Sequence, residues 1–60
     1  MWKCDVYKDQ GGNYRWRLKA ANGQIVASSG ESFSSHANAS TAAENVKANA
    51  GSATVVDADD

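Results

Sequence analysis

Apolar and polar residues alternate along residues 2–8 and 14–20, which is the period of a strand with one buried face. The inward positions of these two stretches are Trp2, Cys4, Val6, Tyr14, Trp16 and Leu18. A glycine-containing turn cluster, residues 9–13, separates them, and Asn22-Gly23 precedes a third stretch of strand character at 24–28. We therefore predict a three-stranded antiparallel meander, in which Asn22-Gly23 forms a type I′ turn.

The period changes to 3.6 residues after Phe33, which predicts a helix that runs to about Ala48. Ser34 or Ser35 is placed to cap its start, and Gly51 to end it. The stripe that faces the sheet comprises His36, Ala39, Ala42, Ala43, Val46 and Ala50. Since this stripe is mostly alanine, the helix must lie close to the sheet. The aromatic side chains expected to fill the space between the two are Trp2, Tyr14 and Trp16.

Residues 54–56 (Thr-Val-Val) suit a short final strand, which gives the order β-β-β-α-β and an α+β fold class. A strand this short needs an edge, either in its own sheet or in the sheet of a second subunit. We expect residues 1–56 to form a single module, followed by an acidic tail at 57–60.

The size of the chain favours a dimer. With 60 residues, the chain buries only ~60% of the surface that its unfolded form exposes, so its stability is marginal. One cysteine, Cys4, cannot form an internal disulfide, and one histidine, His36, offers no zinc pattern. Because disulfides, metals and oligomers are the usual ways to stabilise so small a fold, we expect a homodimer.

The polar face of the second strand is cationic. Arg15, Arg17 and Lys19 project together, and Lys3 on the neighbouring strand can join them. Such a face can bind nucleic acid, contact a protein partner or simply be solvated. The formal net charge of −1 argues against nucleic acid, which stays the alternative to a protein contact.

Several short motifs resemble the YegP-like family, the uncharacterised domain of unknown function 1508. They are Tyr7-Lys8-Asp9, Gly12, residues 14–23 (YRWRLKAANG), Ser29-Gly30-Glu31 and Phe33-Ser34-Ser35. Ser32 and Phe33 depart from the glycine and tyrosine that are usual there. The resemblance implies an antiparallel sheet packed on one helix, in members that carry one module or two in tandem. A single module that dimerises would rebuild the tandem pair, but the family implies no activity.

The sequence offers little for catalysis. Cys4 and His36 are the one thiol and the one imidazole, and no third group orients them, so we expect no catalytic pair and no enzyme. We likewise expect no cofactor, no metal and no small-molecule substrate. No secretory leader or apolar run near 18 residues is present, which favours the cytoplasm over a membrane. The sequence thus predicts a non-enzymatic homodimeric interaction module.

Overall fold

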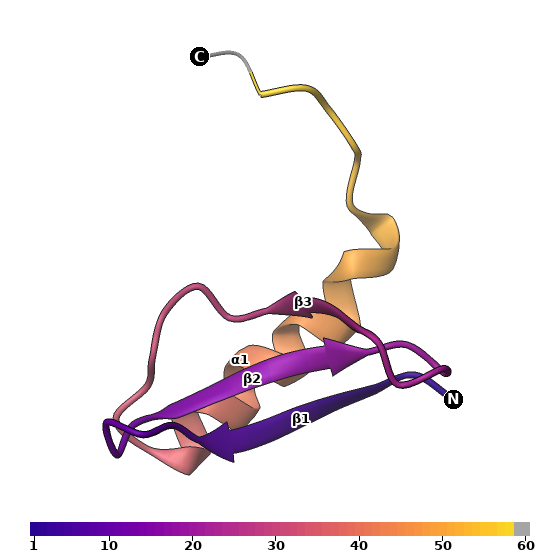
Figure 1. Cartoon of the computed structure of the whole chain (residues 1–60). Coiled ribbons are helices and arrows are strands. Elements are labelled where there is room, and N and C mark those ends of the chain that lie inside the picture. The colour runs from indigo at the N-terminus through magenta and orange to yellow at the C-terminus, as the bar shows by residue number, and fades with distance from the viewer. Residues whose placement is uncertain (59–60) are drawn as a thin grey trace.

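The structure is a computed structural model that describes residues 1–58. An antiparallel sheet in the order β1-β2-β3 is covered on one face by one long helix (Figure 1). The elements are β1 (Lys3–Lys8), β2 (Tyr14–Lys19), β3 (Ile25–Ser28), α1 (His36–Asn49) and the 3-10 turn η1 (Ala50–Ser52). The predicted α+β meander packed on one helix is confirmed.

Both hairpins turn through three-residue loops that end in glycine. Gly12 and Gly23 have φ angles of 86° and 88°, in the left-handed region that glycine adopts without steric cost. The predicted type I′ turn is wrong, because Asn22 has no positive φ and a three-residue loop needs a left-handed residue only at its end. The closing backbone hydrogen bonds run from Asp9 N–H to the Asn13 carbonyl (2.7 Å) and from Ala20 N–H to the Gln24 carbonyl (2.8 Å).

The central strand β2 has a second neighbour built from two pieces. After β3 ends, Phe33 returns to the sheet and exchanges two backbone hydrogen bonds of 2.8 Å with Tyr14. Between these pieces, Ser29 N–H donates to the Trp16 carbonyl at 2.9 Å, and Trp16 N–H donates to the Ser29 hydroxyl at 3.3 Å. Ser29 is buried, so its hydroxyl takes the place of the carbonyl that a continuous strand would have supplied.

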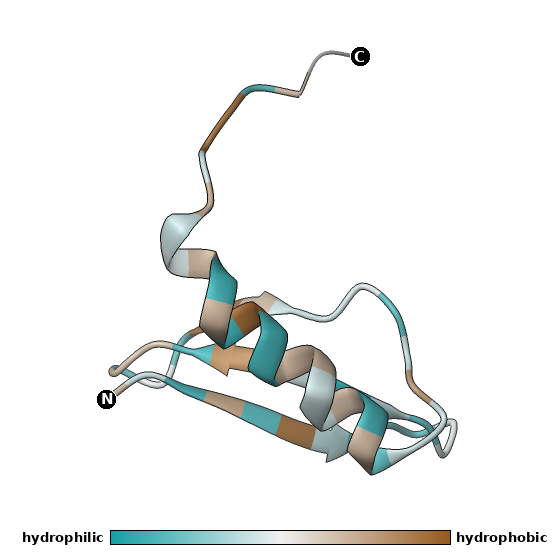
Figure 2. Ribbon diagram, turned by 180° about the vertical axis from the view of Figure 1, so that it is seen from behind, coloured by the Kyte–Doolittle hydropathy of each residue, from teal (hydrophilic) through white to brown (hydrophobic). Residues whose placement is uncertain are grey.

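The helix begins at one of the two predicted caps and lies close to the sheet. The Ser35 hydroxyl accepts a hydrogen bond of 3.1 Å from Asn38 N–H, as an N-cap does. Ala39 and Ala43 are 0% and 7% exposed, and α1 packs across β1 and β2 (Figure 2). Trp16, at 9% exposed, is the large apolar side chain buried in this layer. The alanine stripe thus acts as predicted over the first half of the helix.

Two details of the prediction are wrong, one in the core and one at the end of the helix. Trp2 precedes β1 and is 57% exposed, so it does not fill the space between helix and sheet. Gly51 is not a left-handed cap, because its φ is not positive and the helix instead tightens into η1. Every residue of β3 is exposed, since the helix does not extend over this strand.

Residues 53–58 leave η1 without regular secondary structure and run away from the sheet (Figure 1). Val55 and Val56 are 98% and 75% exposed. The predicted final strand is therefore not formed within the single chain, and its pairing with a second subunit stays a prediction. Of the predicted acidic tail, Asp59 and Asp60 lie outside the described residues.

Candidate functional site

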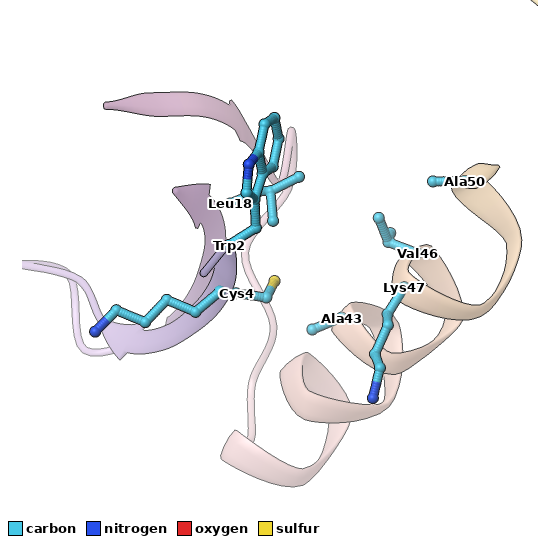
Figure 3. A pocket seen from close by; sticks show the side chains of 8 residues that line it. Trp2, Cys4, Leu18, Ala43, Val46, Lys47 and Ala50 are labelled. Carbon is cyan, nitrogen blue, oxygen red and sulfur yellow. The ribbon is translucent and has the colours of Figure 1, made fainter. Parts of the chain in front are cut away.

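An apolar groove of about 420 Å³ lies between the start of β1 and the second half of α1 (Figure 3). Cys4 and Leu18 come from the sheet, and the helix presents Ala43 and Val46 opposite them. The lining residues are Trp2, Lys3, Cys4, Leu18, Ala43, Val46, Lys47 and Ala50. Its polar side-chain groups are the cysteine thiol, the Trp2 indole N–H and the ammonium groups of the two lysines.

The groove exists because small residues continue along the helix after it diverges from the sheet. Ala39 is fully buried where the two layers are closest, whereas Val46 is only half-buried and Ala50 is exposed. An alanine side chain cannot bridge a wider gap, and Trp2 stands at the side of the groove rather than in it. The side chains that line a cavity of this kind lack the van der Waals contacts that they would make in a filled core.

Sequence reasoning missed this groove, although a signal was present. The alanine stripe predicts a close helix, and it also leaves Ala43 and Ala50 too small to cover the apolar end of the sheet. The direction in which the helix diverges depends on tertiary packing, which the 3.6-residue period does not specify. Leu18 and Val46 were each assigned correctly to a core-facing side, but they face each other across an open space.

The thiol and the imidazole lie toward opposite ends of the layer. Cys4 pairs with Leu18 at the groove, whereas His36 packs edge-on against Tyr14 with a ring-centroid distance of 5.7 Å. Tyr14 and Leu18 are four residues apart on β2, about 14 Å along the strand. Burial raises the pKa of Cys4, and the charges of nearby carboxylates act in the same direction. The thiol is therefore protonated at neutral pH and poorly nucleophilic.

The cations of the strand face have acidic partners within the chain. Asp5 Oδ2 lies 3.4 Å from Lys19 Nζ and 3.7 Å from Arg17 Nε. The Arg17 guanidinium also stacks over the Tyr7 ring, 4.4 Å from its centroid. Lys3 pairs in register with Lys19, so the two side chains project from the same face of the sheet, and Lys3 also contributes to the lining of the groove. The structure thus groups two of the four predicted site residues around one carboxylate.

Arg15, the remaining predicted site residue, is bound to the first hairpin loop. Its Nε donates to Asp9 Oδ2 at 2.9 Å, while Asp9 Oδ1 accepts from the backbone N–H groups of Gly11 (2.9 Å) and Asn13 (3.0 Å). The hydrogen bond from Arg15 is the main cause that lowers the pKa of Asp9, and the backbone N–H groups lower it further. Arg15 therefore stabilises a turn, which reduces its availability to a partner.

We expect Asp9→Asn to make stability less dependent on pH. A carboxyl group whose pKa is lower in the folded than in the unfolded chain stabilises above its unfolded pKa of about 4 and loses that contribution as the pH falls through the lowered value. Urea unfolding between about pH 6 and pH 2 should show a smaller acid-induced loss in the variant. Glu31→Gln, which removes an exposed charge in another loop, is the control and should follow the wild type. An unchanged acid loss in Asp9→Asn would contradict the role given to this carboxylate.

Two negative findings concern the described part of the chain. Residues 1–58 bring together no group of three or more His, Cys, Asp or Glu side chains that could hold a metal ion. Within the same residues, α1 is 14 residues long, and no helix has both the length and the apolar character needed to cross a membrane.

The fold and its groove define a small α+β module with an open apolar groove, and comparison with known proteins gives its family. A model of the domain of unknown function DUF1508 matches residues 9–57, and the chain belongs to this family. This confirms the assignment made from the sequence motifs. The family's function is unknown, so membership supports the fold and assigns no activity.

Relatives and solved structures agree with this assignment. UPF0339 protein Atu0232 from Agrobacterium fabrum is 42% identical over 57 residues, which cover 95% of this chain and 90% of the relative. The solution structure of a protein from Haloferax volcanii is similar with a TM-score of 0.86 at 42% identity, covering 95% of both chains. That of protein ATU0232 from Agrobacterium tumefaciens gives a TM-score of 0.75 at 41% identity, covering 95% of this chain and 90% of the other.

Proposed function

We propose that this chain is a non-enzymatic interaction module whose working form is a homodimer, with the subunits meeting over the apolar groove. The observation that carries this proposal is the solvent-accessible surface area of the chain. The chain exposes 4681 Å², whereas a folded monomer of 6.3 kDa exposes ~3,700 Å². The excess of roughly 900 Å² is close to the ~800 Å² that each partner buries in a standard protein interface.

The exposed surface also has the composition of an interface. Among residues 1–58 the buried apolar side chains are Trp16, Ala39 and Ala43, two of them alanines. The large apolar side chains left exposed include Trp2, Ile25, Val26, Val55 and Val56. Single exposed apolar residues are ordinary, but an open apolar groove with an exposed tryptophan at its side is typical of a contact surface. Burying this surface in a dimer would supply core that the single chain lacks.

A protein partner fits the strand face better than nucleic acid does. Asp5 and Asp9 form ion pairs with Arg15, Arg17 and Lys19, so phosphate groups would have to displace existing ion pairs. The groove, which holds Lys3, is apolar rather than cationic. We place the homodimer and its further protein contacts ahead of nucleic-acid binding for these reasons. A lone free thiol, Cys4, is also typical of reducing compartments, and we assign the module to the cytoplasm on that ground.

The test is the solution mass from light scattering over about 1 μM to 1 mM protein, with far-UV circular dichroism on the same samples. We expect twice the chain mass of 6.3 kDa at high concentration. Helical signal should fall as the dimer dissociates, since folding and association are then linked by mass action. A folded monomer at every concentration would overturn the proposal.

A matched pair of helix variants locates the contact. Val46→Lys places a charge in the groove and should raise the dimer dissociation constant at least about tenfold, the effect of burying an unpaired charge at an interface. Ala48→Lys places the same charge on an exposed position of the same helix and should leave association unchanged. Equal effects of the two variants would show that the subunits meet elsewhere.

A further inference from the structure

The face of the sheet that α1 does not cover is polar and mostly cationic. The helix packs on one side of β1 and β2 (Figures 1 and 2), the side to which Cys4 and Leu18 point. The alternate residues of both strands therefore project from the other side. They form three directly opposed pairs, which are Lys3 with Lys19, Asp5 with Arg17, and Tyr7 with Arg15. Directly opposed residues share one face of an antiparallel sheet, so these side chains form one surface.

The charges at one end of this surface are not balanced. Lys3, Arg17 and Lys19 share it with the single carboxylate of Asp5, a local excess of two positive charges in a chain whose formal net charge is −1. Like charges that face each other across two strands destabilise a sheet, and Lys3 and Lys19 are such a pair. None of the ion pairs formed within residues 1–58 involves Lys3. The chain thus carries a repulsion that an added anion would relieve.

Arg17 is held in place by stacking rather than by hydrogen bonds to a carboxylate. Its guanidinium lies over the Tyr7 ring, 4.4 Å from the centroid. Its Nε is buried and has no hydrogen-bond partner among the described residues, because Asp5 Oδ2, at 3.7 Å, is beyond hydrogen-bond range. The same oxygen lies closer to Lys19 Nζ, at 3.4 Å. A guanidinium whose orientation is fixed by a ring loses little entropy when its outer N–H groups bind a carboxylate.

We infer that Lys3, Arg17 and Lys19 bind an extended, carboxylate-rich segment of a partner protein. The inference rests on the proposed role of the chain as an interaction module and does not depend on the homodimer. Arg17 and Lys19 are two residues apart on β2, about 6.8 Å along the strand. Acidic residues at every second position of an extended peptide have the same spacing, so each carboxylate meets one cation. Arg15 stays outside the site, because its Nε donates to Asp9 at 2.9 Å.

The groups around the cations suit a protein segment better than a nucleic acid. Ile25 of β3 pairs with Lys19 and is 52% exposed, so an apolar side chain borders the cationic end of the surface. A peptide can place an apolar residue against it, whereas a phosphate backbone cannot. Proteins that bind single-stranded nucleic acid offer open aromatic faces on which bases stack. On this surface the Tyr7 ring is half-buried and lies beneath the Arg17 guanidinium.

The decisive experiment is a titration of the ¹⁵N-labelled full chain, followed by ¹H–¹⁵N correlation spectra that include the Arg17 Nε–H signal. The probe is an acetylated, amidated peptide of sequence Glu-Thr-Glu-Thr-Glu-Leu, and the control peptide has glutamine in place of each glutamate. We expect saturable shifts of the Arg17 Nε–H and of the Tyr7 and Lys19 amides with the glutamate peptide only. Equal shifts with both peptides, or shifts confined to the groove, would overturn the inference.

Two further measurements on the same samples separate the alternatives. A short oligothymidylate that binds this face more tightly than the glutamate peptide would show that the partner is a nucleic acid, and the inference would fail. Light scattering reports the oligomeric state independently of the titration. A dimer that does not bind the glutamate peptide overturns this inference alone, whereas a monomer that binds it overturns the homodimer alone.

Charge-matched variants locate the binding surface. Arg17→Gln combined with Lys19→Gln should raise the dissociation constant of the glutamate peptide at least about tenfold, because two charge-assisted contacts are lost. Lys8→Gln combined with Lys47→Gln removes the same total charge at the Tyr14 ring and on α1, and should change the constant less than about threefold. Equal losses in the two double variants would mean that net charge alone attracts the peptide, which would contradict a defined site.

Asp5→Asn tests the site by a gain of binding, which a misfolded chain does not produce. Asp5 is the carboxylate that competes with the peptide for Arg17 and Lys19. Its removal should lower the dissociation constant of the glutamate peptide by about three- to tenfold. The dispersion of the amide signals shows in the same spectra that the variant is folded. Unchanged or weaker binding by the folded variant would refute the assignment of the site to these cations.

Discussion

Trp16→Ala is expected to leave the chain unfolded at 25 °C. Trp16 is 9% exposed and lies at the middle of β2, beneath the helix. Truncating a buried tryptophan costs about 3–5 kcal/mol, and a 60-residue domain has only about 3–9 kcal/mol of folding free energy in total. Far-UV circular dichroism and the dispersion of amide proton signals should both show the loss.

Two further variants separate packing from the mere presence of a large residue. Trp16→Phe keeps an aromatic ring at the site and should remain folded, with a loss of about 1–2 kcal/mol. Val26→Ala removes apolar atoms from a position that is 46% exposed and should change the free energy of unfolding by less than about 0.5 kcal/mol. If Trp16→Ala unfolded at the wild-type urea midpoint, the centre of the core would have to lie elsewhere.

The burial of Trp16 was predictable from the alternation of the second strand, because a period of two places every second residue on the same face. The exposure of Trp2 was not, although it follows the same alternation. Its position depends on where β1 begins and on how far the helix extends over that end of the sheet. Both are properties of the packed molecule, and β1 begins one residue after Trp2. The alternation therefore predicts on which face of the sheet a side chain lies, but not whether the helix covers it.

In the hairpins, too, one feature was predictable from the sequence and another was not. The positions of both turns followed from their glycines, but Asn22-Gly23 suits a two-residue and a three-residue loop alike. Loop length sets the strand register, and the three-residue first loop places Asp5 opposite Arg17. A sequence argument that chose this loop length would have found the ion pairs of the cationic face.

The candidate site was the least predictable part. The cationic residues were singled out because charge is visible in a sequence, whereas the groove is made of alanine, leucine and valine positions that look like ordinary core. They form a groove because no side chain fills the space between them, and that space results from the angle between the helix and the sheet. The exposed Val55-Val56 pair was noticed in the sequence as an element in need of an edge. In the single chain both side chains are exposed, so the pairing of this segment with an edge stays a prediction.

Ala39→Leu is expected to lower the free energy of unfolding by about 1–3 kcal/mol. Ala39 is 0% exposed where α1 lies closest to the sheet, so a larger side chain must displace the helix or adopt a strained rotamer. Helix propensity contributes little, since leucine and alanine are both strong helix formers. The urea midpoint, measured at one and the same protein concentration for variant and wild type, reports the loss.

Ala37→Leu is the matched control, because it makes the same substitution two residues earlier, at an exposed position of the same helix. Its effect should stay within about 0.5 kcal/mol. A large loss at Ala39 with none at Ala37 would mean that the helix is held by close contact at its first half, where the alanines are buried. Equal small effects would mean that the helix can lift from the sheet along its whole length. The groove would then be a movable gap instead of a fixed consequence of how the two layers diverge.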